Sequence, residues 1–143
     1  AYLSTSFESQ PAIHAGDRIG AGPWHNIKGI RIARGVADLH SEHNNLNADT
    51  ALTETGGTIE GVGGSQNRHY ILTGTLQDGT ASEATCNNWT SGDEGETLVG
   101  HFDRQGGGDF ATSWNAAHLS AGCSQQSLES TGGGGLFYCF ASD

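Results

Sequence analysis

Two histidines and an aspartate lie close enough along the chain to suggest a metal site. His101 and Asp103 are separated by one residue, and His118 follows in the same polar segment. Two imidazoles and a carboxylate can bind Zn²⁺ and leave one position open for water, the minimal layout of a hydrolytic metal centre. A structural alternative has Asp103 and Arg104 tying the segment down by charge-assisted hydrogen bonds while the histidines satisfy backbone groups. The spacing reveals no nucleophile, base and orienting group, which favours this alternative.

Carboxylates in the same segment offer a different kind of metal ligand. Asp93, Glu94, Glu96 and Asp109 lie among glycines, and carboxylate oxygens suit Ca²⁺. Acidic loop residues are usually only solvated, so a calcium site and a plain acidic loop both stay open. We expect no obligatory cofactor, with Ca²⁺ or Zn²⁺ as the alternatives.

The three cysteines of the chain are Cys86, Cys123 and Cys139. There is no CxxC pair and no Cys/His pair at zinc-finger spacing, which favours disulfide use in an oxidising compartment over metal binding. An odd number leaves one thiol over. We therefore expect a secreted, extracellular protein with one cysteine that is unpaired or paired to another polypeptide.

Composition narrows the range of partners. Sixteen acidic residues against six basic ones give a net charge of −10. Such a chain repels phosphate backbones and anionic membranes, so nucleic acid and lipid head groups are poor partners. No run approaches the roughly 18 apolar residues of a membrane span, and no membrane insertion is expected. The length of 143 residues, 34% of them hydrophobic, fits one domain over 1–143 with one modest core.

Short strands and glycine-rich loops must position these residues. The chain has 23 glycines and two prolines, a composition typical of turns and irregular loops with few long helices. Residues 1–4, 69–75 and 136–140 are predicted as strands. A small hairpin is predicted over 27–32 and one helical turn over 36–40.

Several short motifs occur in a distinctive order along nearly the whole chain. They are Ala1-Tyr2-Leu3-Ser4, Asp17-Arg18, Pro23-Trp24, the strand 29–33, Asp38-Leu39, Asp78-Gly79-Thr80, Cys86-Asn87-Asn88-Trp89-Thr90-Ser91, Trp114-Asn115, Cys123 and Leu136-Phe137-Tyr138-Cys139-Phe140. Their order and spacing resemble those of secreted C-type-lectin-like domains of the endostatin branch, many of them bacterial. The resemblance implies an α+β, C-type-lectin-like fold that is loop-rich, with a small antiparallel sheet and few short helices.

The resemblance also implies a disulfide pattern. An inner disulfide would join Cys86 to Cys123 and, in the chain-entropy model, stabilise the fold by about 4 kcal/mol. The family's outer disulfide joins the last cysteine, here Cys139, to a cysteine in a helix that precedes the strand matching 1–4. This sequence has no counterpart of that cysteine, so we expect an upstream segment to be trimmed or supplied by another polypeptide. Alternatively, Cys139 is a small buried apolar residue on the last strand.

Calcium-mediated sugar binding, which the wider C-type lectin class uses, is not expected here. That class employs a loop with a cis proline and a Trp-Asn-Asp strand. Both prolines of this chain lie far from the long loop, at positions 11 and 23, and the nearest strand match is Trp114-Asn115-Ala116. Without a carboxylate at Ala116, the site loses an oxygen ligand that Ca²⁺ requires.

We expect a non-enzymatic extracellular recognition or adhesion domain that binds a glycan or a protein through its disulfide-tied long loop. Aromatic side chains in a polar, glycine-rich frame suit stacking on sugars or packing against a protein. The expected contact residues are Trp89, Phe102, Phe110, Trp114 and Asn115. Some of these aromatics, the two tryptophans first, must also belong to the core.

Two alternatives of other classes remain. The chain could be a structural subunit of an extracellular assembly, either as a homo-oligomer or with a second chain that completes the N-terminal region. It could instead be a metal-dependent hydrolase that uses His101, Asp103 and His118.

Overall fold

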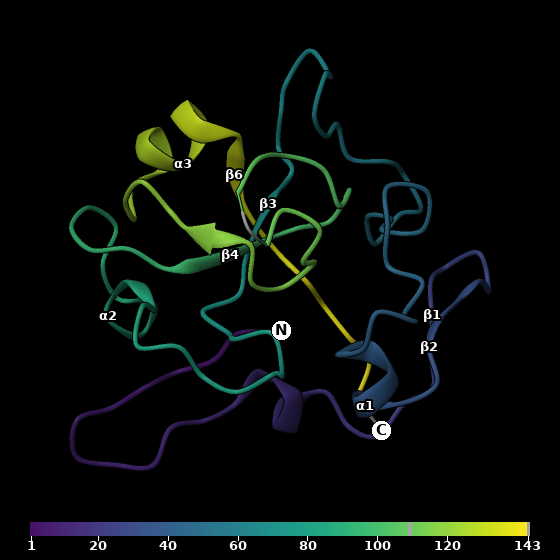
Figure 1. The fold of residues 1–143 in the computed structure, drawn as a ribbon, viewed down its shortest axis with the longest axis horizontal. Coiled ribbons are helices and arrows are strands. Elements are labelled where there is room, and N and C mark those ends of the chain that lie inside the picture. The colour runs from purple at the N-terminus through teal and green to yellow at the C-terminus, as the bar shows by residue number, and fades with distance from the viewer. Residues whose placement is uncertain (109, 143) are drawn as a thin grey trace.

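The computed structural model describes residues 1–108 and 110–142, which form a small α+β protein with two small sheets and few helices (Figure 1). The elements follow one another as η1 (Ala15–Arg18), β1 (Trp24–His25), β2 (Arg31–Ala33), α1 (Val36–Leu39), β3 (Tyr70–Leu72), α2 (Cys86–Trp89), β4 (Leu98–His101), β5 (His118–Leu119), α3 (Gln125–Thr131) and β6 (Gly133–Phe137). The expected α+β class is confirmed at this level. Within the described residues, no helix is long and apolar enough to cross a membrane.

The larger sheet has four strands in the order β5-β4-β3-β6. β4 pairs with β3 and β5 in antiparallel fashion, with Ile71 opposite Gly100. β6 lies parallel to β3, with Ile71 opposite Leu136. The sheet is therefore mixed, whereas the resemblance implied an antiparallel one. A parallel neighbour needs a crossover connection, and here the chain runs through β4, β5 and α3 before it returns beside β3.

The smaller sheet is the hairpin of β1 and β2, with Trp24 opposite Ala33. Its turn is closed by the N–H of Gly29, which donates to the Asn26 carbonyl at 2.8 Å. Gly29 has a φ of 77°, a value that glycine adopts without steric cost. The hairpin predicted over 27–32 is present, with one strand before that range at Trp24–His25 and the other overlapping its end at Arg31–Ala33. α1 coincides with the predicted helical turn.

The core lies where the two sheets and the N-terminal run meet. Tyr2, Leu39, Ile71 and Trp114 are buried there. The ring centroids of Tyr2 and Trp114 are 4.9 Å apart. The Tyr2 hydroxyl donates to Nε2 of His40 at 2.6 Å, because the other ring nitrogen of His40 donates to the Val36 carbonyl. A buried hydroxyl is thus satisfied inside the aromatic core.

The N-terminal run, predicted as a strand over 1–4, is extended and joins other elements through single bonds. The N–H of Tyr2 donates to the Tyr138 carbonyl at 2.8 Å, and the N–H of Ser4 donates to the Thr73 carbonyl at 3.0 Å. The first residues of the chain are therefore fixed both to the end of β3 and to the segment after β6.

α2 is a single turn in the left-handed region. Cys86, Asn87, Asn88 and Trp89 have φ angles of 50°, 52°, 54° and 66°. Left-handed backbone costs an L-residue about 1–2 kcal/mol, although asparagine tolerates it better than most. The turn is closed by the N–H of Trp89, which donates to the Thr85 carbonyl at 2.9 Å.

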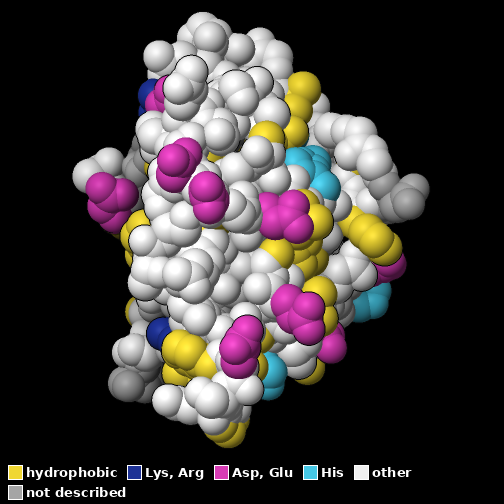
Figure 2. All heavy atoms as spheres, turned by 90° about the vertical axis from the view of Figure 1, so that its left-hand side faces the viewer, with side chains coloured by type: hydrophobic (Ala, Val, Ile, Leu, Met, Phe, Trp, Pro, Cys, Tyr) yellow, Lys and Arg dark blue, Asp and Glu magenta, His cyan; other side chains and the backbone are white. Residues whose placement is uncertain are grey.

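The disulfide implied by the resemblance is present and anchors this turn. Cys86 is bonded to Cys123, with their Cα atoms 5.8 Å apart and a sequence separation of 37. It ties α2 to the residues just before α3. Figure 2 shows the molecule from the side on which α2 lies in Figure 1. Acidic side chains are scattered over that face, and few basic ones accompany them. Negative charge is therefore dispersed there instead of gathered into one site.

Candidate functional site

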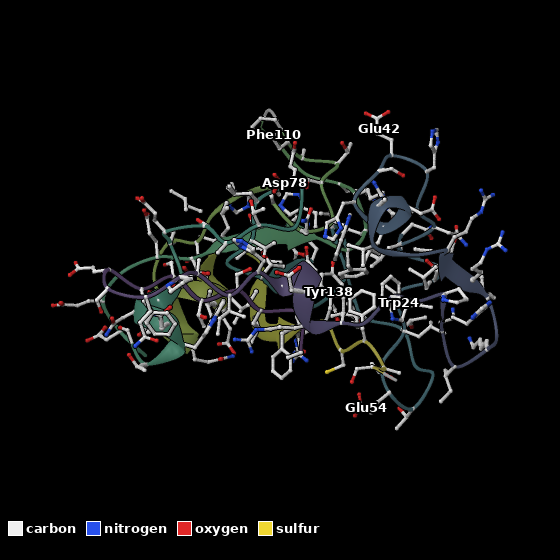
Figure 3. The ribbon with its side chains drawn as sticks, turned by 90° about the horizontal axis from the view of Figure 1, so that it is seen from below. Trp24, Glu42, Glu54, Asp78, Phe110 and Tyr138 are labelled. Carbon is white, nitrogen blue, oxygen red and sulfur yellow. A yellow bond between two sulfur atoms is a disulfide. The ribbon has the colours of Figure 1, made fainter. Side chains whose placement is uncertain are left out.

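An apolar groove of about 740 Å³ lies between the β1–β2 hairpin, the loop around residues 50–60 and the last residues of the chain. Its walls include Trp24, Ile27, Leu46, Ile59, Phe137 and Phe140. Figure 3 shows Trp24, Tyr138 and Glu54, which also line this groove, away from the side that carries Phe110 and Asp78. We call this hollow the hairpin groove.

The apolar side chains of the hairpin groove differ in exposure. Trp24 and Ile32 are 6% and 8% exposed and belong to the core. Ile27 and Phe137 are 63% and 50% exposed, although both are large and hydrophobic. Large apolar side chains gathered around a hollow are typical of a surface that another molecule covers.

Charged groups are few and lie at the rim of the hairpin groove. The Glu60 carboxylate accepts hydrogen bonds from the Gln66 N–H at 2.7 Å and from the Ser65 hydroxyl at 2.8 Å. These bonds hold the pKa of Glu60 below its ordinary value, so the rim stays anionic at neutral pH. The Arg68 guanidinium donates a hydrogen bond to the side-chain carbonyl of Gln66 at 2.6 Å.

Cys139 lines the same groove and is exposed and free of any disulfide. This agrees with one cysteine being left over. The alternative that Cys139 is a small buried apolar residue is wrong, because its neighbours Tyr138 and Phe140 turn toward the core while its own side chain faces solvent.

His101 and His118 do come together, with ring centroids 5.1 Å apart, and His69 joins them. The rings of His69 and His101 are stacked, with centroids 4.3 Å apart and an interplanar angle of 30°. Stacked imidazoles present faces to each other, while metal binding requires the nitrogen lone pairs to converge. Within residues 1–108 and 110–142, no three His, Cys, Asp or Glu side chains form a group that could hold a metal ion.

Asp103 and Arg104 hold the loop after β4 in the way the structural alternative describes. Asp103 pairs with Nδ1 of His69 at 3.3 Å and accepts from the Val62 N–H at 2.9 Å. Arg104 donates to the Leu46 carbonyl at 2.6 Å and to the side chain of Asn44 at 2.6 Å. These bonds join the loop after β4 to several points of the long connection between α1 and β3, so the polar cluster is part of the framework.

The two stacked histidines are buried as neutral groups. Nδ1–H of His101 donates to the Ala111 carbonyl at 2.8 Å, which leaves Nε2 as an acceptor, buried and without a partner. Burial lowers the pKa of His101. It also lowers the pKa of His69, against the raising effect of Asp103. Protonation of both imidazoles would place a second positive charge in this stack, where no group would compensate it.

Acidification should destabilise the protein before its carboxylates titrate. The pKa values of His40, His69 and His101 lie below the ordinary 6.5 in the folded state. As pH falls through about 6.5, the unfolded chain binds more protons than the folded one, so stability that is full above this pH is progressively lost. Urea unfolding at about pH 7.5 and 5.5 measures the loss. His101→Gln should reduce the dependence of the unfolding free energy on pH, and the exposed His43→Gln should not. Greater stability at the lower pH would contradict the expectation.

The predicted contact residues divide between core and surface. Phe102, Trp114 and Asn115 are 1%, 3% and 2% exposed, so they belong to the interior, and Phe102 also lines the hairpin groove. The Asn115 amide donates to the Leu76 carbonyl at 2.8 Å, an internal role. Trp89 is half-buried, and its indole N–H donates a hydrogen bond to the Ser4 carbonyl at 2.8 Å. The expectation that tryptophans serve the core holds for Trp114.

Phe110 is 54% exposed and borders a second hollow of about 510 Å³, which also includes Leu76, Asp78, His118 and Leu119. This hollow lies between the disulfide-tied loop expected to bind ligand and residues 76–78, and it is smaller than the hairpin groove.

The three proposed acidic calcium ligands that the structure describes do not form a metal-binding group. Asp93, Glu94 and Glu96 are exposed, and Asp109 lies outside the described residues. Nothing in the described chain groups these carboxylates around a common point.

Sequence reasoning missed the hairpin groove and the part played by His69. The groove joins segments far apart in the chain, and only the apolar residues around the predicted hairpin hinted at it. His69 could have been found only if the strand 98–101, which was not predicted, had been paired with the predicted strand 69–75, since Tyr70 lies opposite His101. Comparisons with known protein families, curated proteins and solved structures found no match for this chain. The functional conclusion therefore depends on the geometry.

Proposed function

We propose that this chain is an extracellular, non-enzymatic recognition domain that binds an apolar polypeptide segment in the hairpin groove. The observation that carries the proposal is the exposure of Ile27 and Phe137, which both line a hollow of about 740 Å³. Covering these side chains removes apolar surface from water, the main driving force for association. The site thus differs from the disulfide-tied loop first expected to bind.

The ligand is a polypeptide because the groove offers backbone and apolar surface more than side-chain hydrogen bonds. β6 is an outer strand of its sheet, so one of its edges presents N–H and C=O groups to whatever lies beside it. An extended segment can add to such an edge while its side chains enter the hollow. A glycan would need a denser set of polar side chains than this groove provides.

The C-type-lectin-like fold belongs to the same proposal. The bond between Cys86 and Cys123 supports it, because the resemblance implied that pairing. The exposed thiol of Cys139 supports it as well, since the family's last cysteine pairs with one in a helix outside residues 1–143.

Random peptides displayed on phage and selected on the domain test the proposed site. The selected peptides should be rich in apolar residues, and both Ile27→Asp and Phe137→Asp should weaken their binding by about tenfold or more. The matched control is Phe110→Asp, equally exposed at the other hollow, which should leave binding unchanged. Peptides whose binding depends on Phe110 alone would remove the groove from consideration. Titration calorimetry gives the affinities.

A second candidate function is a structural subunit of an extracellular assembly. It is favoured by the position of the exposed Cys139 thiol beside the outer strand β6. In that case non-reducing mass measurement should show a covalent adduct that Cys139→Ser abolishes. A monomer at low concentration, with a thiol that alkylates freely, would count against assembly.

A further inference from the structure

We propose that the Cys86–Cys123 disulfide controls the hairpin groove by holding α2 in its left-handed turn, which clamps the N-terminal run. On this view the domain is sensitive to thiol reductants. Reduction of the disulfide releases the N-terminal run, taken here as residues 1–6. The last step, from the N-terminal run to ligand binding, rests on the proposed function. The earlier steps are independent of it.

The clamp consists of two side chains that the left-handed turn aims at the N-terminal run. The Asn88 side chain bonds the backbone of Ser6 twice, accepting from its N–H at 2.8 Å and donating to its carbonyl at 2.6 Å. The Trp89 indole N–H donates to the Ser4 carbonyl at 2.8 Å. Turning the four residues right-handed would redirect both side chains, because side-chain direction follows the backbone dihedrals.

The left-handed backbone of the turn has a steric cost that its hydrogen bonds and its disulfide together must offset. None of its four residues is glycine, the only residue that enters this region freely, and φ is positive at each of them. The disulfide fixes the first residue, Cys86, against Cys123. Cys86 and Cys123 are 6% and 9% exposed, and Gly95 lies next to the Cys123 sulfur, where a Cβ atom would be 3.6 Å away.

The N-terminal run continues the connection to the hairpin groove. The Tyr2 N–H donates to the Tyr138 carbonyl at 2.8 Å, and the Tyr2 ring lies 5.9 Å from the ring of Phe140. Tyr138 and Phe140 both line the groove. Loss of the N-terminal run would therefore loosen the wall that carries Cys139, which keeps the bonds from Trp24 to the Ala141 carbonyl and from Tyr138 to the Trp114 carbonyl. The coupling is a contiguous series of contacts from disulfide to turn, run and groove.

The chemical step is an ordinary thiol–disulfide exchange. A dithiol reductant attacks one sulfur, the Cys86–Cys123 bond breaks, and both sulfurs end as protonated thiols. The reductant closes to its own disulfide, so two electrons and two protons are transferred. No other reactant is needed.

Amide hydrogen exchange, corrected for intrinsic rates, tests the release. The Cys139 thiol is first alkylated with a trifluoromethyl reagent. The resulting thioether prevents disulfide exchange with Cys139 and provides a ¹⁹F signal at the groove. Reduction should speed exchange at Ser4 and Ser6 by about tenfold or more and move the ¹⁹F resonance, while Ile71 and Leu72 of β3 stay protected. Unchanged exchange at Ser4 and Ser6 in the reduced, folded protein would overturn the proposal.

Two variants separate the clamp from general instability. Asn88→Ala removes the clamp with the disulfide intact and should give the same local release. Asn87→Gly lowers the cost of the left-handed turn, so the reduced variant should keep most of its protection. If reduction unfolds the whole protein, the test is Asn88→Ala with its disulfide intact. The proposal is overturned if the amides of the N-terminal run stay protected from exchange in this variant.

The same experiment distinguishes this inference from the proposed function, because exchange and ¹⁹F shifts require no ligand. A selected peptide that binds oxidised and reduced protein equally would refute the coupling and leave the groove as a binding site. Release without any peptide binding would refute the groove and leave the disulfide control.

Discussion

Replacing both Cys86 and Cys123 by alanine should lower the free energy of unfolding by about 4 kcal/mol. The disulfide closes a loop with a sequence separation of 37, and its removal restores that loop's freedom to the unfolded chain. A loss of this size corresponds to a fall in the melting temperature of roughly 10–15 °C for a domain of this length. Urea unfolding followed by tryptophan fluorescence measures the change.

Cys139→Ser is the matched control for the disulfide variant. Its thiol is exposed and unbonded, so its loss should change the free energy of unfolding by no more than about 0.5 kcal/mol. Equal losses in the two variants would mean that the destabilisation comes from removing cysteine side chains and not from the cross-link.

Local features of this fold could be predicted because their causes are local. The hairpin turn needs a glycine with positive φ, and Gly29 stands between short apolar runs. The leftover thiol follows from an odd number of cysteines. The pairing of Cys86 with Cys123 came from the resemblance, since spacing alone allows other pairings.

The left-handed turn and the hairpin groove have no comparable local cause. Cys86-Asn87-Asn88-Trp89 contains no glycine, and its conformation is maintained by partners as distant in sequence as Ser6 and Cys123. The groove joins the hairpin, the loop around 50–60 and the last strand. Features of this kind become visible only when contacts between distant residues are known.

Phe102 and Phe110 show most directly where residue type fails to indicate role. Both are phenylalanines in one glycine-rich segment, and both were expected at the binding surface. Phe102 directly follows β4, where the chain still runs along the sheet, and it is 1% exposed; Phe110 lies beyond the loop and is 54% exposed. Register relative to the sheet, which the sequence alone does not specify, decides which ring enters the core.

Phe102→Ala should therefore lower the free energy of unfolding by about 3–5 kcal/mol, since it leaves a cavity in the core beside residues that cannot fully collapse. Phe110→Ala should change it by no more than about 0.5 kcal/mol. Urea unfolding of both variants gives the two values under the same conditions. Similar losses would place Phe110 in the core as well and would remove the basis for using Phe110→Asp as the control for groove binding. A small loss of unfolding free energy in Phe102→Ala would mean that the sheet and the N-terminal run do not enclose this ring. The description of the core would then have to be revised before a partner could be assigned to the groove beside it.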